Sequence, residues 1–289
     1  DIKSLKRNTN FDYRPGYLVE NIGMDNTFRT ISGHYKNLPF SIKSTRVILA
    51  AGTLASTRIA LAALNYKGQL PLQDCPMATF LLFAPMSLGV LPKNEFGLGQ
   101  LSYALNIDEH TTAFGSLFST MGIPRSEFIR YLPTKKRYGI DLMSSLLSSC
   151  AVGNMFLPGN LTEARVSITA TGALKIEGGY SQSVDSYFRT AKKKVSTNFR
   201  KLRAVMLPTS FKQGKAGNGI HYSCTMPMQR DPKLGQTNVL GEPYGLKNVH
   251  LVDGSSLSAI NEKSHTLLMM ANADRISALI AQKHFRRQE

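Results

Sequence analysis

The chain has 289 residues, of which 42% are hydrophobic and 19% charged, so its composition is that of a folded globular protein and excludes a disordered one. Its length allows two subdomains, because single domains usually span about 100–200 residues. The formal net charge of +16 raises the question of an anionic partner, such as nucleic acid, an acidic membrane surface or a phosphorylated ligand.

Strands are predicted first, at 17–22 (YLVENI) and 40–50 (FSIKSTRVILA), with a polar turn, GHYKN, between them. The second of these ends in RVILA, a continuous apolar run of the kind found in strands that are buried on both faces.

A glycine turn, AAGT, follows this strand, and a helix is predicted from Arg58 to Leu64. Ser56 and Thr57 stand where residues that cap a helix are expected. Strand, turn and helix together predict one step of a parallel sheet. In open α/β sheets such turns lie at the carboxyl ends of strands, where cofactors bind.

The pattern of the sequence changes near residue 68, and residues 68–215 are predicted to form an α+β insert. Alternating patterns predict a strand at 101–107 and a hairpin at 163–179, and short helices are expected at 127–132 and 140–147. The longest apolar run, at 78–92, carries prolines at both ends and is shorter than the ~20 residues that cross a bilayer. No membrane span is therefore expected.

Much of the excess positive charge lies in a long amphipathic helix that closes the insert. Its predicted apolar stripe is Val184, Phe188, Ala191, Val195, Phe199, Leu202 and Met206. The lysines and arginines at 192–203 then form the solvated face of this helix rather than a nucleic-acid site. A basic nucleic-acid-binding protein remains the last-ranked alternative, because the aromatic residues expected of a single-strand groove do not interleave with these charges.

From residue 216 the sequence again shows the pattern of an α/β fold. NVHLVD (248–253) predicts another short buried strand, and a helix follows with Met269, Ala273, Ile276 and Ile280 on one face and Ser264 as its cap. The α/β part is therefore predicted to be discontinuous, made of residues 1–67 and 216–289 with the insert between them.

Two histidines lie in this last part. His221 follows a glycine-rich loop, GKAGNG, and His265 lies in the turn that enters the final helix. A single histidine is most often structural, but Asp253 closes a buried strand nearby, where an acid needs partners. Acid, loop histidine and helix-start histidine together form a plausible cofactor-facing site, and the other four histidines are read as structural or surface residues.

Cys75, Cys150 and Cys224 are odd in number and have no CxxC spacing, so neither a disulfide framework nor a zinc site is expected. This favours a reducing compartment, and the cytoplasm is the expected location. No signal peptide is visible. The sequence starts DIKSLKRN without a methionine, which favours a fragment of a longer protein.

Four motifs, in order, resemble the carboxyl-terminal half of the glucose–methanol–choline family of FAD-dependent oxidoreductases. VILAAGTLASTRIAL resembles its strand–turn–helix beside the cofactor, NVHLVDGSSL its late strand, and SHTLLMMANADRISALI its final helix. HYSCTMPM resembles its His-x-x-Gly-Thr-x-x-Met segment, with Cys224 where glycine is usual. The predicted fold is then α/β plus α+β: an incomplete, discontinuous, Rossmann-like FAD-binding domain (1–67 and 216–289) with an inserted antiparallel-sheet substrate-binding domain (68–215).

The resemblance implies that FAD is the cofactor and that an alcohol CH–OH group is oxidised to a carbonyl by hydride transfer to the flavin N5. His221 stands at the position of the family's proton acceptor and His265 at its partner position, and which of them is the base stays open. The implied cofactor-binding residues are Ala51, Gly52, Asp253, Gly254, Thr266 and Leu267.

The chain departs from the family at its start, since no GxGxxG turn for the FAD pyrophosphate occurs anywhere in it. A missing amino-terminal half carrying that motif is therefore an expected partner. The substrate is expected to be a small-molecule alcohol, sugar-like or anionic. The sequence does not identify the electron acceptor. A flavin-containing lyase and a non-catalytic subunit of the same fold remain alternatives.

Overall fold

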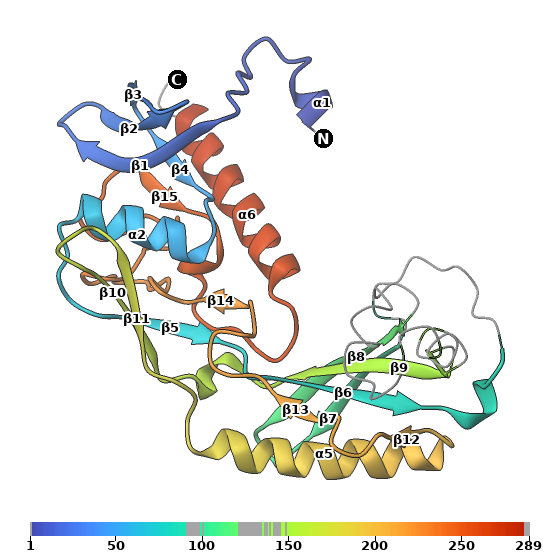
Figure 1. Ribbon diagram of the computed structural model, residues 1–289. Coiled ribbons are helices and arrows are strands. Elements are labelled where there is room, and N and C mark those ends of the chain that lie inside the picture. The colour runs from blue at the N-terminus through green and yellow to red at the C-terminus, as the bar shows by residue number, and fades with distance from the viewer. Residues whose placement is uncertain are drawn as a thin grey trace.

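The computed structural model describes residues 2–90, 99, 101–120, 135, 138, 140, 146–147 and 149–285. The helices predicted at 127–132 and 140–147 lie largely outside the described residues. Figure 1 shows two bodies of regular structure joined by a smaller sheet: one holds both ends of the chain, and the other holds a long, curved sheet with a helix beneath it.

The amino-terminal part, after a short helix α1 (Ile2–Leu5), is an antiparallel meander. Its strands are β1 (Tyr17–Met24), β2 (Arg29–Tyr35) and β3 (Leu38–Ser44). The predicted turn GHYKN was wrong in its first three residues, which belong to β2. The turn itself is Lys36–Asn37, and both residues have positive φ (48° and 66°), as a two-residue hairpin turn requires.

A parallel pair of strands forms the centre of this body. β4 (Val47–Leu49) pairs with β15 (Val249–Leu251), although about 200 residues separate them, and Leu49 lies opposite Leu251. Helix α2 (Thr53–Ala63) follows β4 directly, so the predicted strand–turn–helix step is confirmed. The predicted caps were wrong, because α2 begins one turn earlier, at Thr53, behind Gly52 with φ 87°.

A four-stranded antiparallel sheet, in the order β11-β10-β5-β14, joins the two bodies. Its strands are β5 (Leu70–Asp74), β10 (Ala164–Ile168), β11 (Leu174–Glu177) and β14 (Tyr222–Ser223). The predicted hairpin is confirmed by β10 and β11, in which Val166 faces Ile176. Leu70 and Val166 pack into the same core cluster as Leu49 and Leu251, so this sheet is anchored on the β4–β15 body.

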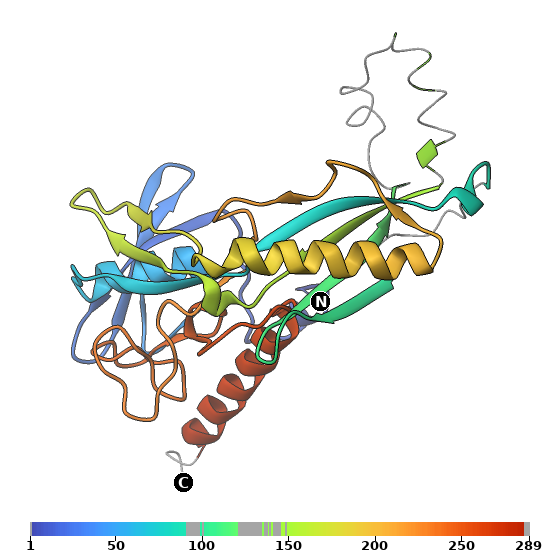
Figure 2. The ribbon, with the colours of Figure 1, turned by 90° about the horizontal axis from the view of Figure 1, so that it is seen from below.

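The second body is a six-stranded antiparallel sheet. Its strands are β6 (Met77–Phe83), β7 (Leu101–Asn106), β8 (Thr112–Ser119), β9 (Cys150–Phe156), β12 (Val205–Met206) and β13 (Lys212–Gln213). Figures 1 and 2 show helix α5 (Ser183–Lys201) running along one face of it, where the two form a separate hydrophobic core. The opposite face of this sheet carries the partly buried Phe156 toward the other body.

The apolar stripe predicted for α5 is confirmed at the positions that lie within the helix. Val184, Phe188, Ala191, Val195 and Phe199 are buried. The prediction was wrong for Leu202 and Met206, because α5 ends at Lys201: Leu202 is exposed, and Met206 is buried but lies in β12. Two lysines of the basic face contact the protein itself: Lys194 Nζ donates to the Asn106 carbonyl at 2.5 Å, and Lys192 lies over the Phe211 ring.

Helix α6 (Thr266–Phe285) ends the described chain and runs beside the β4–β15 pair (Figure 1). Ile276 and Ile280 pack on Val252, so the predicted inward face is confirmed at these positions. The described residues also include three single 3₁₀ turns: η1 (Pro85–Ser87), η3 (Gly159–Leu161) and η4 (Gly254–Ser256). Among the described residues, no helix combines the length and the apolar character that crossing a bilayer requires.

The described chain is thus a mixed α/β protein with three antiparallel sheets and one parallel pair. The boundaries 1–67, 68–215 and 216–289 stay a prediction.

Candidate active site

The structure brings the two singled-out histidines together from segments 44 residues apart. The ring centroids of His221 and His265 lie 5.3 Å apart with the rings at 80° to each other. Phe156, at the end of β9, packs on the other side of His221 with a centroid distance of 4.7 Å. The pair therefore lies where the six-stranded sheet meets the β4–β15 body.

His221 is positioned by the short strand that follows it. Tyr222 and Ser223 pair with Asp74 and Gln73 of β5, so β14 fixes the direction in which the chain leaves His221. On the other side, the Asp74 carboxylate accepts a hydrogen bond from Gly217 N at 2.8 Å and one from the Tyr180 hydroxyl at 3.1 Å. The glycine-rich loop before His221 is thereby tied to β5.

The loop also depends on a close approach at Gly219. A Cβ atom there would lie 2.3 Å from the Cys75 carbonyl oxygen and 2.4 Å from Asp74 Oδ1, which leaves no room for a side chain. The residue after it, Ile220, has φ 54° although it is β-branched, and it is 75% exposed. Such a backbone persists only where the surroundings hold it in place, which is common at functional sites.

His265 stands directly before α6, and its carbonyl accepts the first helical hydrogen bond, from Met269 N at 2.8 Å. The free N–H groups of the first turn of a helix and the helix dipole favour negative charge at this end. The loop before it is fixed through Ile260, whose N–H donates to Gln73 at 3.1 Å and whose carbonyl accepts from Gly159 N.

Both imidazoles are kept neutral by their surroundings. Burial lowers the pKa of His221 below its ordinary value, and the neighbouring His265 lowers it further. Burial likewise lowers the pKa of His265. The Nδ1 atoms of both rings are buried without a hydrogen-bond partner among the described residues, so both rings keep capacity for a ligand.

A pocket of about 440 Å³ opens beside the pair. It is lined by Ala51, Gly52, Thr53, Leu54, Ala55, Ile220, Tyr222, His265 and Met269. The β4–α2 turn and the start of α6 thus face the same space, and each contributes a helix amino terminus. A Cβ atom at Gly52 would meet nothing within 4 Å, so the space above this turn is open.

Asp253 and Gly254 lie in the wall of the site rather than in its opening. Asp253 is 4% exposed; its Oδ2 accepts from Ser56 Oγ at 2.5 Å, and its Oδ1 accepts from Ser255 N and Ser255 Oγ. Gly254 is buried where an added Cβ would lie 2.5 Å from Thr53 Oγ1. These two residues join η4 to α2 and so hold the turn that lines the pocket.

Thr266 and Leu267, the other two predicted cofactor-binding residues, begin α6 and are exposed, Leu267 by 78%. The structure therefore brings Ala51, Gly52 and His265 to one pocket, with His221 against His265. It places Thr266 and Leu267 next to His265 in the chain.

The HYSCTMPM segment carries a second local feature. Cys224 has φ 65°, which is the left-handed region that glycine adopts without strain, and it stands where the resembled motif usually has glycine. Its N–H donates to the Gly254 carbonyl at 2.9 Å, and Thr225 Oγ1 lies 2.6 Å from Thr57 Oγ1. The segment is thereby bonded to both η4 and α2.

Sequence reasoning missed Phe156, Tyr222 and Ile220 as site residues. Phe156 ends a strand and differs little in pattern from other strand aromatics, so no local signal could have found it. Tyr222 and Ile220 flank His221, and proximity to a candidate catalytic residue was the signal available.

The cysteines do not form an alternative candidate for a catalytic site. All three cysteines are free, and burial raises the pKa of the Cys75 and Cys224 thiols to about 12, so neither is a thiolate near neutral pH. Within the described residues, no group of three or more histidine, cysteine or acidic side chains is arranged to hold a metal ion.

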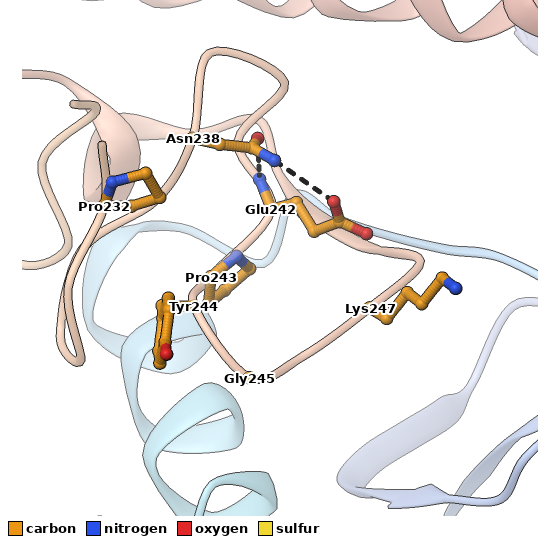
Figure 3. Close-up of a pocket in the computed structure, with 7 residues that line it drawn as sticks. All are labelled: Pro232, Asn238, Glu242, Pro243, Tyr244, Gly245 and Lys247. Carbon is orange, nitrogen blue, oxygen red and sulfur yellow. Dashed lines mark hydrogen bonds between the residues drawn. The ribbon is translucent and has the colours of Figure 1, made fainter. Parts of the chain in front are cut away.

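A second pocket, of about 280 Å³, lies in the loop between β14 and β15 (Figure 3). It is lined by Pro232, Asn238, Glu242, Pro243, Tyr244, Gly245 and Lys247. Asn238 and Glu242 bond each other through both side chain and backbone, at 3.1 Å in each case. Their polar groups are used to shape the loop, so the histidine pocket is the better candidate.

Comparison with known proteins gives matches in structure alone. No protein-family model matches the sequence, and no curated protein matches it. The pyridoxine 4-oxidase from Mesorbium loti superimposes with a TM-score of 0.57 at 12% identity, over 91% of this chain and 57% of its own. An FAD-dependent oxidoreductase from Chaetomium thermophilum, solved with a bound fragment, gives 0.56 at 13% identity, over 98% of this chain and 63% of its own.

The chain thus spans less than two thirds of either solved structure. Its mixed α/β architecture with antiparallel sheets is a fold found in FAD-dependent oxidoreductases.

Proposed function

We propose that this chain is the carboxyl-terminal portion of an FAD-dependent oxidoreductase of the glucose–methanol–choline type, which oxidises an alcohol to a carbonyl. The observation that carries the proposal is the pair of neutral imidazoles, His221 and His265, 5.3 Å apart beside an open pocket. The shared fold with FAD-dependent oxidoreductases supports it.

The residues around the pocket fit a flavin. The β4–α2 turn at Ala51 and Gly52 leaves open space above its backbone, so a planar group can approach closely. The first turns of α2 and α6 both point free N–H groups toward this region, which suits the phosphates and the negative charge of a reduced flavin. Ala51, Gly52, Thr266 and Leu267 are the proposed cofactor contacts, and Asp253 and Gly254 support them from beneath.

Bound FAD would supply the two-electron acceptor for the carbinol carbon. The chain's own residues handle the proton. A neutral imidazole accepts the hydroxyl proton as the carbon is oxidised, and the second imidazole donates an N–H hydrogen bond to the same oxygen. Phe156 packs against the ring of His221 at a tilt of 34° and helps to exclude water from it.

A missing amino-terminal half is the proposed partner for cofactor binding. Two parallel strands are too few for an α/β sheet, and parallel sheets are normally covered on both faces. Ile48, in the middle of β4, is nevertheless 51% exposed. A segment with the GxGxxG turn would add strands beside β4 and hold the pyrophosphate.

The test is the visible absorption spectrum of the purified chain, alone and joined to the remainder of its reading frame, after FAD is added and excess is removed. The longer protein is expected to retain a flavin band that alcohols bleach under anaerobic conditions. His221→Ala should keep the band and lose the bleaching, whereas His110→Ala, in the exposed loop between β7 and β8, should keep both. A longer protein that binds no flavin would refute the proposal.

Retained flavin with unchanged bleaching in His221→Ala would refute the role of the histidine. Retained flavin without bleaching by any alcohol would instead favour the lyase or the non-catalytic subunit. The cytoplasm stays the proposed location.

A further inference from the structure

A lysine lies close to the histidine pair along the chain. Lys263 precedes His265 by two residues, so their Cα atoms are at most about 7 Å apart. Its Nζ lies 5.8 Å from the centroid of the Phe114 ring, which belongs to β8 of the six-stranded sheet. The loop that delivers His265 therefore also reaches across to the other body of the protein.

Phe114 continues the wall on which His221 rests. It is directly paired with Phe156 across β8 and β9, and residues that face each other in antiparallel strands point to the same side of the sheet. Their neighbours Ala113 and Met155 point to the opposite side, into the core beneath α5. A series of neighbouring side chains thus runs from Lys263 to Phe114, across the β8–β9 pairing to Phe156, and on to His221 and His265.

The ammonium at the end of this series has no ion-pair partner in the described part of the chain, where three ion pairs occur and none includes Lys263. The adjacent residue, Glu262, takes part in none of these ion pairs either. At 5.8 Å the contact with Phe114 is at the outer limit of a cation–π interaction. This contact is weak enough for an anion to replace it.

We propose that Lys263 and the Phe114–Phe156 wall select an alcohol whose apolar or aromatic body carries a carboxylate or phosphate at the end away from the reacting hydroxyl. The inference rests on the proposed function, because it assumes that the hydroxyl is held by His221 and His265. The aromatic wall packs on the body of the substrate, and the ammonium pairs with its anionic end.

Equilibrium binding tests this without any redox step. Titration calorimetry at low salt would compare 4-(hydroxymethyl)benzoate with benzyl alcohol, which lacks the carboxylate, on the same protein used for the flavin spectra. The wild-type protein is expected to bind the carboxylate probe about two- to fivefold more tightly, the effect of an exposed ion pair. Raised salt should reduce that ratio.

Three variants distinguish the effect of the Lys263 charge on probe binding from the effect of side-chain packing. Lys263→Met should bring the ratio close to one while changing benzyl alcohol binding by less than about twofold, since only the charge is removed. Lys263→Arg should keep the preference. Lys247→Met, a lysine that lines the pocket of Figure 3, is the matched control and should behave as wild type.

Equal binding of the two probes by the wild-type protein, including no binding of either, would overturn the proposal. A preference that survives in Lys263→Met would also overturn it. If that variant keeps the preference and loses affinity for FAD, Lys263 lies at the cofactor instead. A preference that depends on Lys263, in a protein whose flavin no alcohol reduces, would refute the proposed oxidation and leave the charge selection standing.

Discussion

Burial lowers the pKa of each histidine of the candidate site, and this predicts how the rate of flavin reduction depends on pH. Burial favours the neutral form of both rings, so both are unprotonated above their ordinary pKa of about 6.5 and remain so somewhat below it. As the pH falls through the lowered values, the rings bind protons and can no longer accept one from an alcohol. The rate of flavin reduction should therefore fall on the acid side with a midpoint below about pH 6.5.

The pair also predicts how one ring responds to loss of the other. His265→Asn removes a neighbour whose positive charge opposes protonation of His221, so the pKa of His221 should rise toward its ordinary value. NMR titration of the imidazole C–H signals would measure this directly. An unchanged His221 titration in that variant would mean that burial alone sets its pKa.

Cys224 tests the backbone conformation of the histidine segment. Its φ of 65° costs an L-residue about 1–2 kcal/mol, whereas glycine adopts it freely. Glycine elsewhere in regular structure is less stable than alanine by about 0.5–1 kcal/mol. Cys224→Gly is therefore expected to be at least as stable as Cys224→Ala in urea unfolding. The alanine variant being the more stable by about 1 kcal/mol would show that burial, not φ, dominates at this position.

At the scale of elements, the link between Ser56 of α2 and Asp253 before η4 holds the β4–α2 turn in place. Ser56→Ala would remove the partner of a buried carboxylate oxygen, and an unsatisfied buried acceptor costs about 1–3 kcal/mol. Chemical denaturation should show a loss of that size. Ser186→Ala, on the exposed face of α5, is the control and should change stability by less than about 0.5 kcal/mol. Equal losses in both variants would contradict a special role for this link.

The apolar run at 40–50 predicted a single strand buried on both faces, but the structure has two strands here, β3 and β4, and Ile48 is 51% exposed. Periodicity in the sequence was enough to predict the β10–β11 hairpin and the inward face of α5, because each buries one face locally. It failed at β2. Gly33 signals a turn, yet it lies within the strand, where a Cβ atom would lie 1.9 Å from the Leu18 carbonyl oxygen beside a β-bulge. That glycine is required by a neighbouring strand, and such a requirement is not visible in local sequence.

The same limit applies to the site. His221, His265, Ala51 and Gly52 were identified because motifs mark them; three of these line one pocket, and the fourth, His221, contacts its lining at His265. Phe114, Phe156 and Lys263 meet only through the pairing of β8 with β9 and the path of a loop, which are properties of the tertiary fold. Asp253 was singled out as an acid that needs partners, and its partners prove to be Ser56 and Ser255.

At the scale of the whole molecule, apolar side chains are exposed on the parallel pair and at the start of α6. Ile48, Leu267 and Met270 are 51%, 78% and 62% exposed, although they lie on the elements nearest the candidate cofactor site. Exposed apolar surface gathered in one region usually marks an interface. The proposed amino-terminal half, which would supply the rest of the FAD-binding domain, is the partner that this surface fits.

The isolated chain should therefore bind a hydrophobic dye such as ANS, and Leu267→Gln with Met270→Gln should reduce that fluorescence. Met86→Gln is the control, because Met86 is 73% exposed in η1, which follows β6 of the six-stranded sheet. Joining the chain to the remainder of its reading frame should lower dye binding as well, since strands placed beside β4 would cover the same residues. Dye fluorescence that the double variant leaves unchanged, or that the longer protein retains in full, would mean that this surface is not where the missing half docks.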